Sequence, residues 1–203
     1  MKCEYIIKSL ERLLSYRVGN EEARNVAEHL FLKYGSLDRI LSADVNILYE
    51  DEKVGGEAAF LIKLASSLIS RAKTESYKFG IKHTPEETDR YFKALLLPRS
   101  VECVYAMSYD AKGRAVGADL LSEGVVNASE ILPRKVIEVA KRRGAKYMIL
   151  AHNHPHGTAE ASEDDISSTM SIARILANSD VKLARHIIVS GTDVTSIMIG
   201  GDL

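Results

Sequence analysis

The segment from Tyr147 to Thr169 constrains this chain more than any other. It reads YMILAHNHPHGTAEASEDDISST, an apolar run followed by two histidines, a proline and glycine loop, and an acidic helix start. The length and apolar content of Tyr147–Ala151 predict a buried strand that ends where His152 and His154 begin. Residues two apart in an extended chain point to the same side, so both imidazoles can reach one metal ion.

A carboxylate follows the two histidines. Asp165 lies eleven residues after His154, in the first turn of a predicted helix whose N-cap is Ser162. Two imidazoles and one carboxylate leave a fourth tetrahedral position for water, which is typical of catalytic rather than structural zinc. The segment therefore predicts a Zn²⁺ site of the hydrolase kind, with His152, His154 and Asp165 as ligands.

The residues by themselves leave alternatives open. Ser162–Asp165 also fits an ordinary capping box, in which the Asp165 side chain folds back onto the Ser162 backbone. Two histidines at this spacing are, taken alone, more often structural than metal-binding. Asp164 is an alternative ligand one residue before Asp165. We interpret His156, in the loop, as a surface residue rather than a further ligand or a substrate contact.

The same residues resemble a known motif. The JAMM, or MPN-plus, metalloprotease motif has an upstream glutamate and then HxHx7SxxD, and its fixed positions are occupied by His152, His154, Ser162 and Asp165. The surrounding AHNHPHG and SEDDIS are similar to the RadC branch of that superfamily. The resemblance implies an MPN/JAMM fold, which is cytidine-deaminase-like, and a zinc-dependent metallopeptidase that cleaves peptide or isopeptide bonds in a protein or peptide substrate.

The upstream glutamate is assigned by the resemblance, because spacing does not select among Glu102, Glu123, Glu130 and Glu138. RadC-like sequences place this residue at the start of the first strand, in a context like VECVYAMSYD, which implies Glu102. By alternation Glu102 shares a face with Val104 and Ala106, so its carboxylate lies either at the solvated strand end or toward the site. The resemblance implies that Glu102 acts as general base and then acid, and that the Ser162 hydroxyl binds the oxyanion.

The loop departs from the RadC-like pattern HNHPSGD, since His156 replaces the serine and Thr158 the aspartate. His186 matches a family position near the site and stands at the start of the last predicted strand. We expect it to be a buried histidine that is hydrogen-bonded to the backbone.

The remaining patterns predict two domains, residues 1–76 and 77–203. The first reads as short helices, with a helix-hairpin-helix-like turn at Lys53–Gly56. The second has predicted strands at 101–110, 115–124, 147–151 and 186–190, a helix at 84–97, a helix at 133–143 and a helix after Ser162. We therefore predict an α/β fold with a mixed sheet flanked by helices, preceded by a small all-α domain.

Composition limits the function classes. The net charge is −1, and residues 1–77 hold 11 Lys and Arg against 12 Asp and Glu, so DNA binding in repair or recombination is only a weaker alternative. A non-catalytic MPN scaffold is a further alternative.

The sequence has no long apolar run, and its two cysteines are far apart. We therefore expect a cytoplasmic protein without a membrane partner. The sequence does not fix its oligomeric state.

Overall fold

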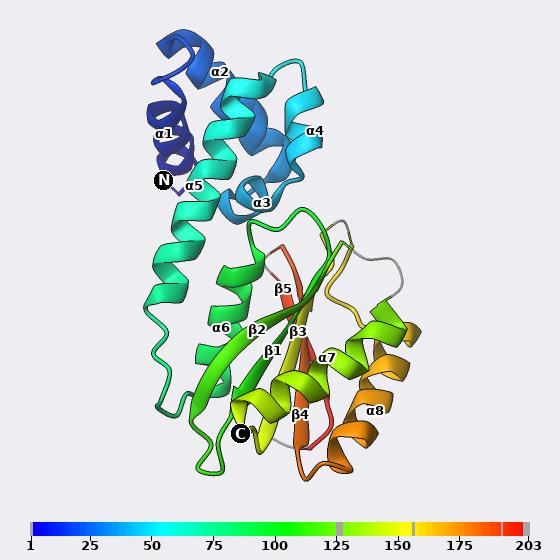
Figure 1. The fold of residues 1–203 in the computed structure, drawn as a ribbon. Coiled ribbons are helices and arrows are strands. Elements are labelled where there is room, and N and C mark those ends of the chain that lie inside the picture. The colour runs from blue at the N-terminus through cyan, green and yellow to red at the C-terminus, as the bar shows by residue number, and fades with distance from the viewer. Residues whose placement is uncertain (1, 125–127, 156, 192, 201–203) are drawn as a thin grey trace.

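The computed structural model describes residues 2–124, 128–155, 157–191 and 193–200. Its N-terminal part is helical (Figure 1). The helices there are α1 (Lys2–Leu14), α2 (Asn20–Tyr34), α3 (Leu37–Ser42), α4 (Val45–Glu50) and α5 (Gly55–Glu75). They enclose a core of their own, whose largest fully buried side chains include Leu14, Leu30, Ile40, Leu48 and Ile62. The N-terminal part is therefore an all-α unit, as the sequence predicts.

Local chemistry sets the ends of these helices. The Ser36 hydroxyl accepts a hydrogen bond from the Arg39 amide at the start of α3, and the Asp44 carboxylate accepts two amides at the start of α4. Gly35 ends α2 with φ at +77°, a conformation that glycine adopts without a steric penalty. Short helices with such caps account for the tight connections of this unit.

The C-terminal part is built on one sheet with the strand order β2-β1-β3-β4-β5 (Figure 1). Its strands are β1 (Cys103–Tyr109), β2 (Ala115–Glu123), β3 (Tyr147–Asn153), β4 (Lys182–Ser190) and β5 (Asp193–Met198). Only β3 and β4 pair in parallel. Helix α8, between them, makes the crossover that a parallel pair needs. The mixed α/β sheet flanked by helices is confirmed.

Helices cover both faces of this sheet. α6 (Pro85–Leu96) packs on one face, where Phe92, Met107 and Ile149 belong to one buried cluster. α7 (Ala128–Arg143) and α8 (Glu163–Ala177) pack on the other, where Val136 and Ile172 belong to one buried cluster. Alternate residues of each strand face opposite layers, so even-numbered residues of β1 and β3 face α7 and α8.

Several sequence-based boundaries were wrong. Strand β5 was not predicted, although DVTSIM after the turn at Gly191 contains the β-branched residues Val194, Thr195 and Ile197. β4 begins at Lys182 rather than at His186. α7 begins at Ala128, so Pro133 lies inside the helix rather than near its start, and Glu130 belongs to this helix rather than to a connection. The charged residues Lys182 and Arg185 interrupt the apolar pattern at the start of β4, which is why the prediction began this strand too late. The prediction also began α7 too late, because proline is common in the first turn of a helix.

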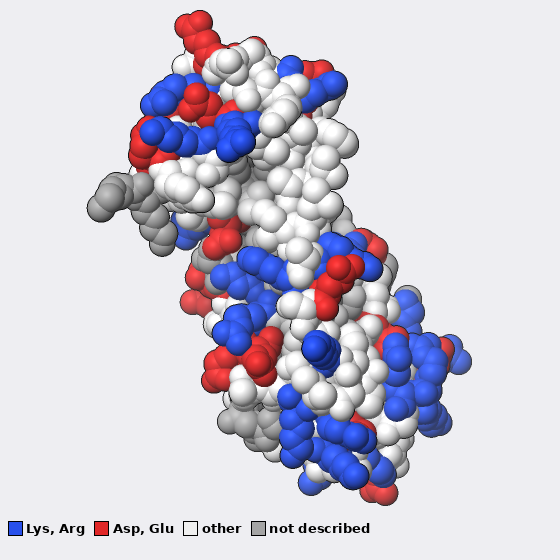
Figure 2. Space-filling model, turned by 90° about the vertical axis from the view of Figure 1, so that its left-hand side faces the viewer, with Lys and Arg blue, Asp and Glu red and all other residues white. Residues whose placement is uncertain are grey.

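Charges of both signs are interspersed on both parts of the molecule, on the face that Figure 2 shows. The upper, helical part of that face also has a wide area without charged side chains. No helix among the described residues is long and apolar enough to cross a membrane.

Candidate metal centre

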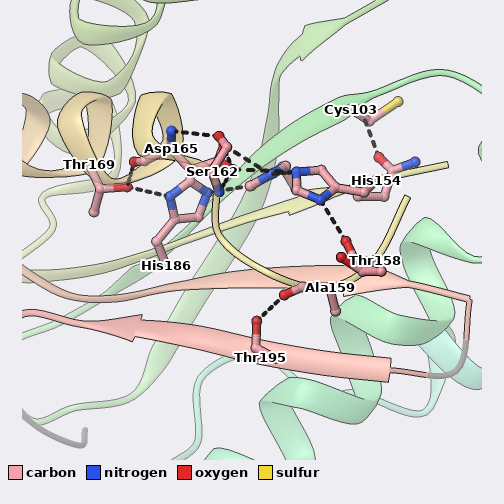
Figure 3. A network of polar contacts seen from close by, with 11 residues as sticks. Cys103, His154, Thr158, Ala159, Ser162, Asp165, Thr169, His186 and Thr195 are labelled. Carbon is pink, nitrogen blue, oxygen red and sulfur yellow. Dashed lines mark hydrogen bonds and ion pairs between the residues drawn. The ribbon is translucent and has the colours of Figure 1, made fainter. Parts of the chain in front are cut away.

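The three predicted metal ligands lie together at the carboxyl end of β3 (Figure 3). His152 is the penultimate residue of β3, His154 follows the strand, and Asp165 lies in the first turn of α8. One ligand atom from each residue lies within 4.8 Å of the other two. The His152 Nε2 atom is 2.8 Å from His154 Nε2 and 3.2 Å from Asp165 Oδ1. The fold therefore brings together residues that are distant in sequence.

The predicted capping box is also present. The Ser162 hydroxyl accepts a hydrogen bond from the Asp165 amide at 3.0 Å, and the Ser162 amide donates to Asp165 Oδ2 at 2.8 Å. The Ser162 hydroxyl also donates to Asp165 Oδ2 at 2.7 Å. Asp165 Oδ1, by contrast, faces His152. The two alternatives for Asp165 are thus compatible, because the cap fixes the carboxylate in the orientation that faces the histidines.

A backbone carbonyl fixes the tautomer of His154. Its Nδ1 atom lies 2.8 Å from the carbonyl oxygen of Thr158. A carbonyl oxygen only accepts hydrogen bonds, so Nδ1 must carry the proton. The Nε2 atom of a neutral His154 then presents a lone pair toward His152 and Asp165.

A buried chain of hydrogen bonds fixes the tautomer of His152. The Thr169 hydroxyl donates to the Asp165 carbonyl at 2.5 Å, and it must then accept a proton from His186 Nδ1 at 2.7 Å. His186 Nε2 is left as an acceptor for His152 Nδ1 at 2.9 Å. The Nε2 atom of His152 consequently has a lone pair as well.

This set of atoms fits a divalent metal ion. Two imidazole lone pairs and a carboxylate converge, and neutral histidine nitrogen with carboxylate oxygen is a donor set that zinc accepts. Burial lowers the pKa of His152 to about 4 and that of His186 to about 3, so both rings are neutral near pH 7. Hydrogen bonds to ring nitrogens that face away from a site orient metal-binding histidines in this way.

The Asp165 carboxylate is ionised under the same conditions. Burial acts to raise its pKa, but hydrogen bonds from the Ser162 hydroxyl and amide, together with the neighbouring rings of His152 and His154, outweigh burial and hold the pKa below its usual value. An ionised carboxylate and neutral imidazoles are the states that bind a metal ion.

Glu102 lies just before β1 rather than in it, and the residue is exposed. Val104 pairs with His152 in the antiparallel register of β1 and β3. Glu102 stands two residues before Val104 and His154 two residues after His152, so the same register brings Glu102 toward His154. Burial of part of the carboxyl raises its pKa; His154 lowers and Asp165 raises that pKa. Glu102 is therefore at the solvated strand end and also close enough to sense the charges of the site.

Asn153, between the two histidines, was not given a role from the sequence. Its Oδ1 atom accepts a hydrogen bond from the Cys103 amide at 2.8 Å, and its Nδ2 atom donates to the Val101 carbonyl at 3.0 Å. These two peptide groups lie on either side of Glu102. Asn153 thus ties the end of β3 to the backbone that carries Glu102.

The other candidates divide clearly. His186 is buried as expected, but its partners are side chains of His152 and Thr169 rather than the backbone, so that expectation was wrong. Asp164 is exposed and is not part of the cluster.

His156 lies outside the described residues. Thr169 was missed because a threonine inside a helix gives no sequence signal of its partner.

Fold and site together define a class, the JAB-type α/β domain with a His/His/Asp cluster at the end of a central strand. The model of the family described as RadC-like JAB domain matches residues 82–201. UPF0758 protein PBPRA0202 of Photobacterium profundum is 30% identical over 175 residues, which cover 86% of this chain and 78% of that protein. UPF0758 protein Reut_A2732 of Cupriavidus pinatubonensis is 30% identical over 191 residues, or 92% and 83% of the two chains. The chain belongs to the RadC family.

Proposed function

We propose that this protein is a zinc-dependent peptidase of the JAMM type. The single observation that carries the proposal is the convergence of two imidazole lone pairs, on His152 and His154, with the Asp165 carboxylate. When both rings are neutral, the hydrogen bonds to Thr158 and His186 place the ring protons on the Nδ1 atoms, so no proton lies between the ligand atoms and a cation is the partner that they best accommodate.

A zinc ion at this site would supply Lewis acidity and lower the pKa of water toward about 7. Glu102 has the chemistry of a proton carrier: its raised pKa favours accepting a proton from the attacking water and delivering it to the departing amine. Asn153 holds the peptide groups on either side of Glu102 and so limits the positions that the carboxylate can take.

Ser162 is the proposed oxyanion donor. In the structure its hydroxyl proton is given to Asp165 Oδ2 at 2.7 Å. Binding an oxyanion therefore requires the hydroxyl to rotate, while the Ser162 amide continues to hold Asp165. An oxyanion donor contributes about 3 kcal/mol to transition-state stabilisation, and the hydrogen bond that Ser162 gives up to Asp165 offsets part of this contribution.

The proposed substrate is a protein or peptide, cleaved at a peptide or isopeptide bond. The relatives carry only the name UPF0758 and give no substrate. DNA binding by the helix-hairpin-helix-like turn has no specific support: Asp51 in this turn accepts the Lys53 amide, and acidic Glu50 and Glu52 stand beside it.

We also propose that residues 1–76 and 77–203 are separate domains. Residues of the N-terminal helical part form one buried cluster, which Leu97 at the end of α6 joins from the other part, and the family match begins at residue 82. Expression of residues 77–203 alone tests this boundary, since a cooperative thermal unfolding transition is expected of an independent domain.

Metal content and hydrolysis test the peptidase proposal together. The wild type is expected to retain about one zinc per chain by elemental analysis and to cleave members of a fluorogenic peptide or isopeptide library. His154→Ala should lose both properties. Glu102→Gln should keep zinc and lose hydrolysis by roughly 10²- to 10⁴-fold.

Each result bears on a different part of the proposal. A wild type that binds no zinc after dialysis against a zinc solution would contradict the proposed metal site. Zinc binding with no hydrolysis of any library member favours a non-catalytic scaffold. Full activity of Glu102→Gln would show that another group carries the proton.

A further inference from the structure

Helix α5 carries an exposed stripe of apolar side chains. None of the residues that the structure describes covers this stripe. Phe60, Leu64 and Leu68 are 65%, 44% and 62% exposed. Their spacing of four residues places them on one side of the helix over successive turns. α5 runs along the outside of the helical unit (Figure 1), and that unit shows a wide uncharged area in Figure 2. Contiguous exposed apolar surface is typical of a protein-binding face.

Charged residues flank the stripe in a symmetric order. On the same side of the helix, Glu57 stands seven residues before Leu64 and Arg71 stands seven residues after it. These two residues have opposite charges. The order is that of a self-complementary surface.

Pairing two copies of α5 antiparallel about Leu64 satisfies all of these residues. Phe60 then faces the partner's Leu68, and Glu57 faces the partner's Arg71. A parallel pairing would instead bring each Glu57 against the partner's Glu57, which is unfavourable. Isologous contact of one surface with its own copy is the commonest symmetry of soluble oligomers.

Glu57 and Arg71 already form ion pairs within the chain, but these ion pairs do not prevent the pairing of Glu57 with the partner's Arg71. Glu57 contacts Arg17 at 2.9 Å, but the two side chains are 55% and 60% exposed. Arg71 contacts Glu75 at 2.5 Å, and both of those side chains are more than half exposed. Exposed pairs contribute little to stability and are readily replaced by equivalent pairs across an interface.

We propose that the chain forms a two-fold symmetric homodimer through antiparallel packing of the α5 stripe around Leu64. The stripe is on the helical unit, so this inference is independent of the metal centre. It also gives the N-terminal helices a role in assembly.

Sedimentation of the full chain over a concentration series tests the dimer. The wild type is expected to reach twice the chain mass of 22.4 kDa and to dissociate on dilution. Leu64→Glu places like charges on the two-fold axis and should leave a monomer at every concentration. Leu32→Glu is the matched control, because Leu32 is 85% exposed but lies on α2, and it should remain dimeric. Circular dichroism checks that each variant is folded.

A charge exchange tests the register. Glu57→Arg and Arg71→Glu should each weaken the dimer, because each opposes like charges across the interface, and the double variant should restore it. Arg17→Ala removes only the intrachain partner of Glu57 and should leave the dimer unchanged.

Three outcomes would overturn the proposal. The first is a wild type that stays monomeric throughout the series, which would leave the stripe to a different protein. The second is a folded Leu64→Glu variant that still dimerises. The third is a double variant that is no better than the single variants, since that result excludes the antiparallel register.

Discussion

The His152 Nδ1 atom lies 2.9 Å from His186 Nε2, and this buried hydrogen bond decides which nitrogen of His152 faces the candidate metal centre. His186 is in turn held by Thr169, whose hydroxyl donates to the carbonyl of Asp165. The chain of bonds therefore begins and ends at two predicted ligands, His152 and Asp165. Loss of His186 or Thr169 is therefore expected to change the orientation of a ligand without removing one.

Replacing His186 is expected to weaken zinc binding although His186 is not a predicted ligand. His186→Phe fills the buried space but leaves the His152 Nδ1 proton without an acceptor. Loss of such an outer hydrogen bond reduces metal affinity by about 10- to 100-fold. Competition with a chromogenic chelator measures the change. Ser167→Ala, an exposed change on α8, is the control. An unaltered affinity of folded His186→Phe would mean that His152 is oriented by other contacts.

Asn153→Ala is expected to destabilise the protein and to slow hydrolysis while zinc stays bound. The substitution leaves the buried Cys103 amide and the part-buried Val101 carbonyl without their partner, and an unsatisfied buried polar group costs about 1 to 3 kcal/mol. Urea unfolding measures the loss, with exposed Asn178→Ala as the control. Asn153→Asp should also destabilise, because a carboxylate has no proton for the Val101 carbonyl. Wild-type stability of both variants would contradict the role assigned to Asn153.

The sequence predicted the site better than it predicted the sheet. The spacing of His152, His154 and Asp165 identified the residues that converge, because a strand end and a helix start impose nearly fixed geometry on their neighbours. His186 and Thr169 could not be linked to the site, since their contacts depend on how β4 and α8 pack. Strand β5 was missed because an edge strand lacks a continuous apolar pattern. Roles of Glu102 and Ser162 remain predictions.

Asp51 should make the helical unit sensitive to acid. Hydrogen bonds from His29 and Lys33 hold the pKa of Asp51 well below its usual value of 3.8. A lowered folded-state pKa contributes stability that is complete above the unfolded-state value and is lost as the pH falls below it. Asp51→Asn should therefore lower the free energy of unfolding at pH 7 and have a progressively smaller effect below about pH 4.

Urea titrations of wild type and Asp51→Asn at several pH values measure this dependence. Asp180→Asn, which changes an exposed aspartate at a left-handed position that asparagine tolerates, is the control. A constant difference between wild type and Asp51→Asn down to about pH 2, where the carboxylate is largely protonated in the unfolded chain, would show that the charge of Asp51 is not what stabilises the turn.

Without metal, the stability of the protein should depend on the two buried histidines, and it should fall with falling pH as it does for Asp51. Burial lowers the pKa of His152 to about 4 and that of His186 to about 3 in the folded chain, against 6.5 for an exposed histidine. The unfolded chain therefore binds more protons between these values, and the stability of the chelator-treated protein should fall as the pH drops from about 6.5 toward 4. His186→Phe removes one of the two groups and should flatten the fall. The midpoint of urea unfolding as a function of pH measures both, and a midpoint that does not change across this range would mean that neither ring is held neutral by the fold.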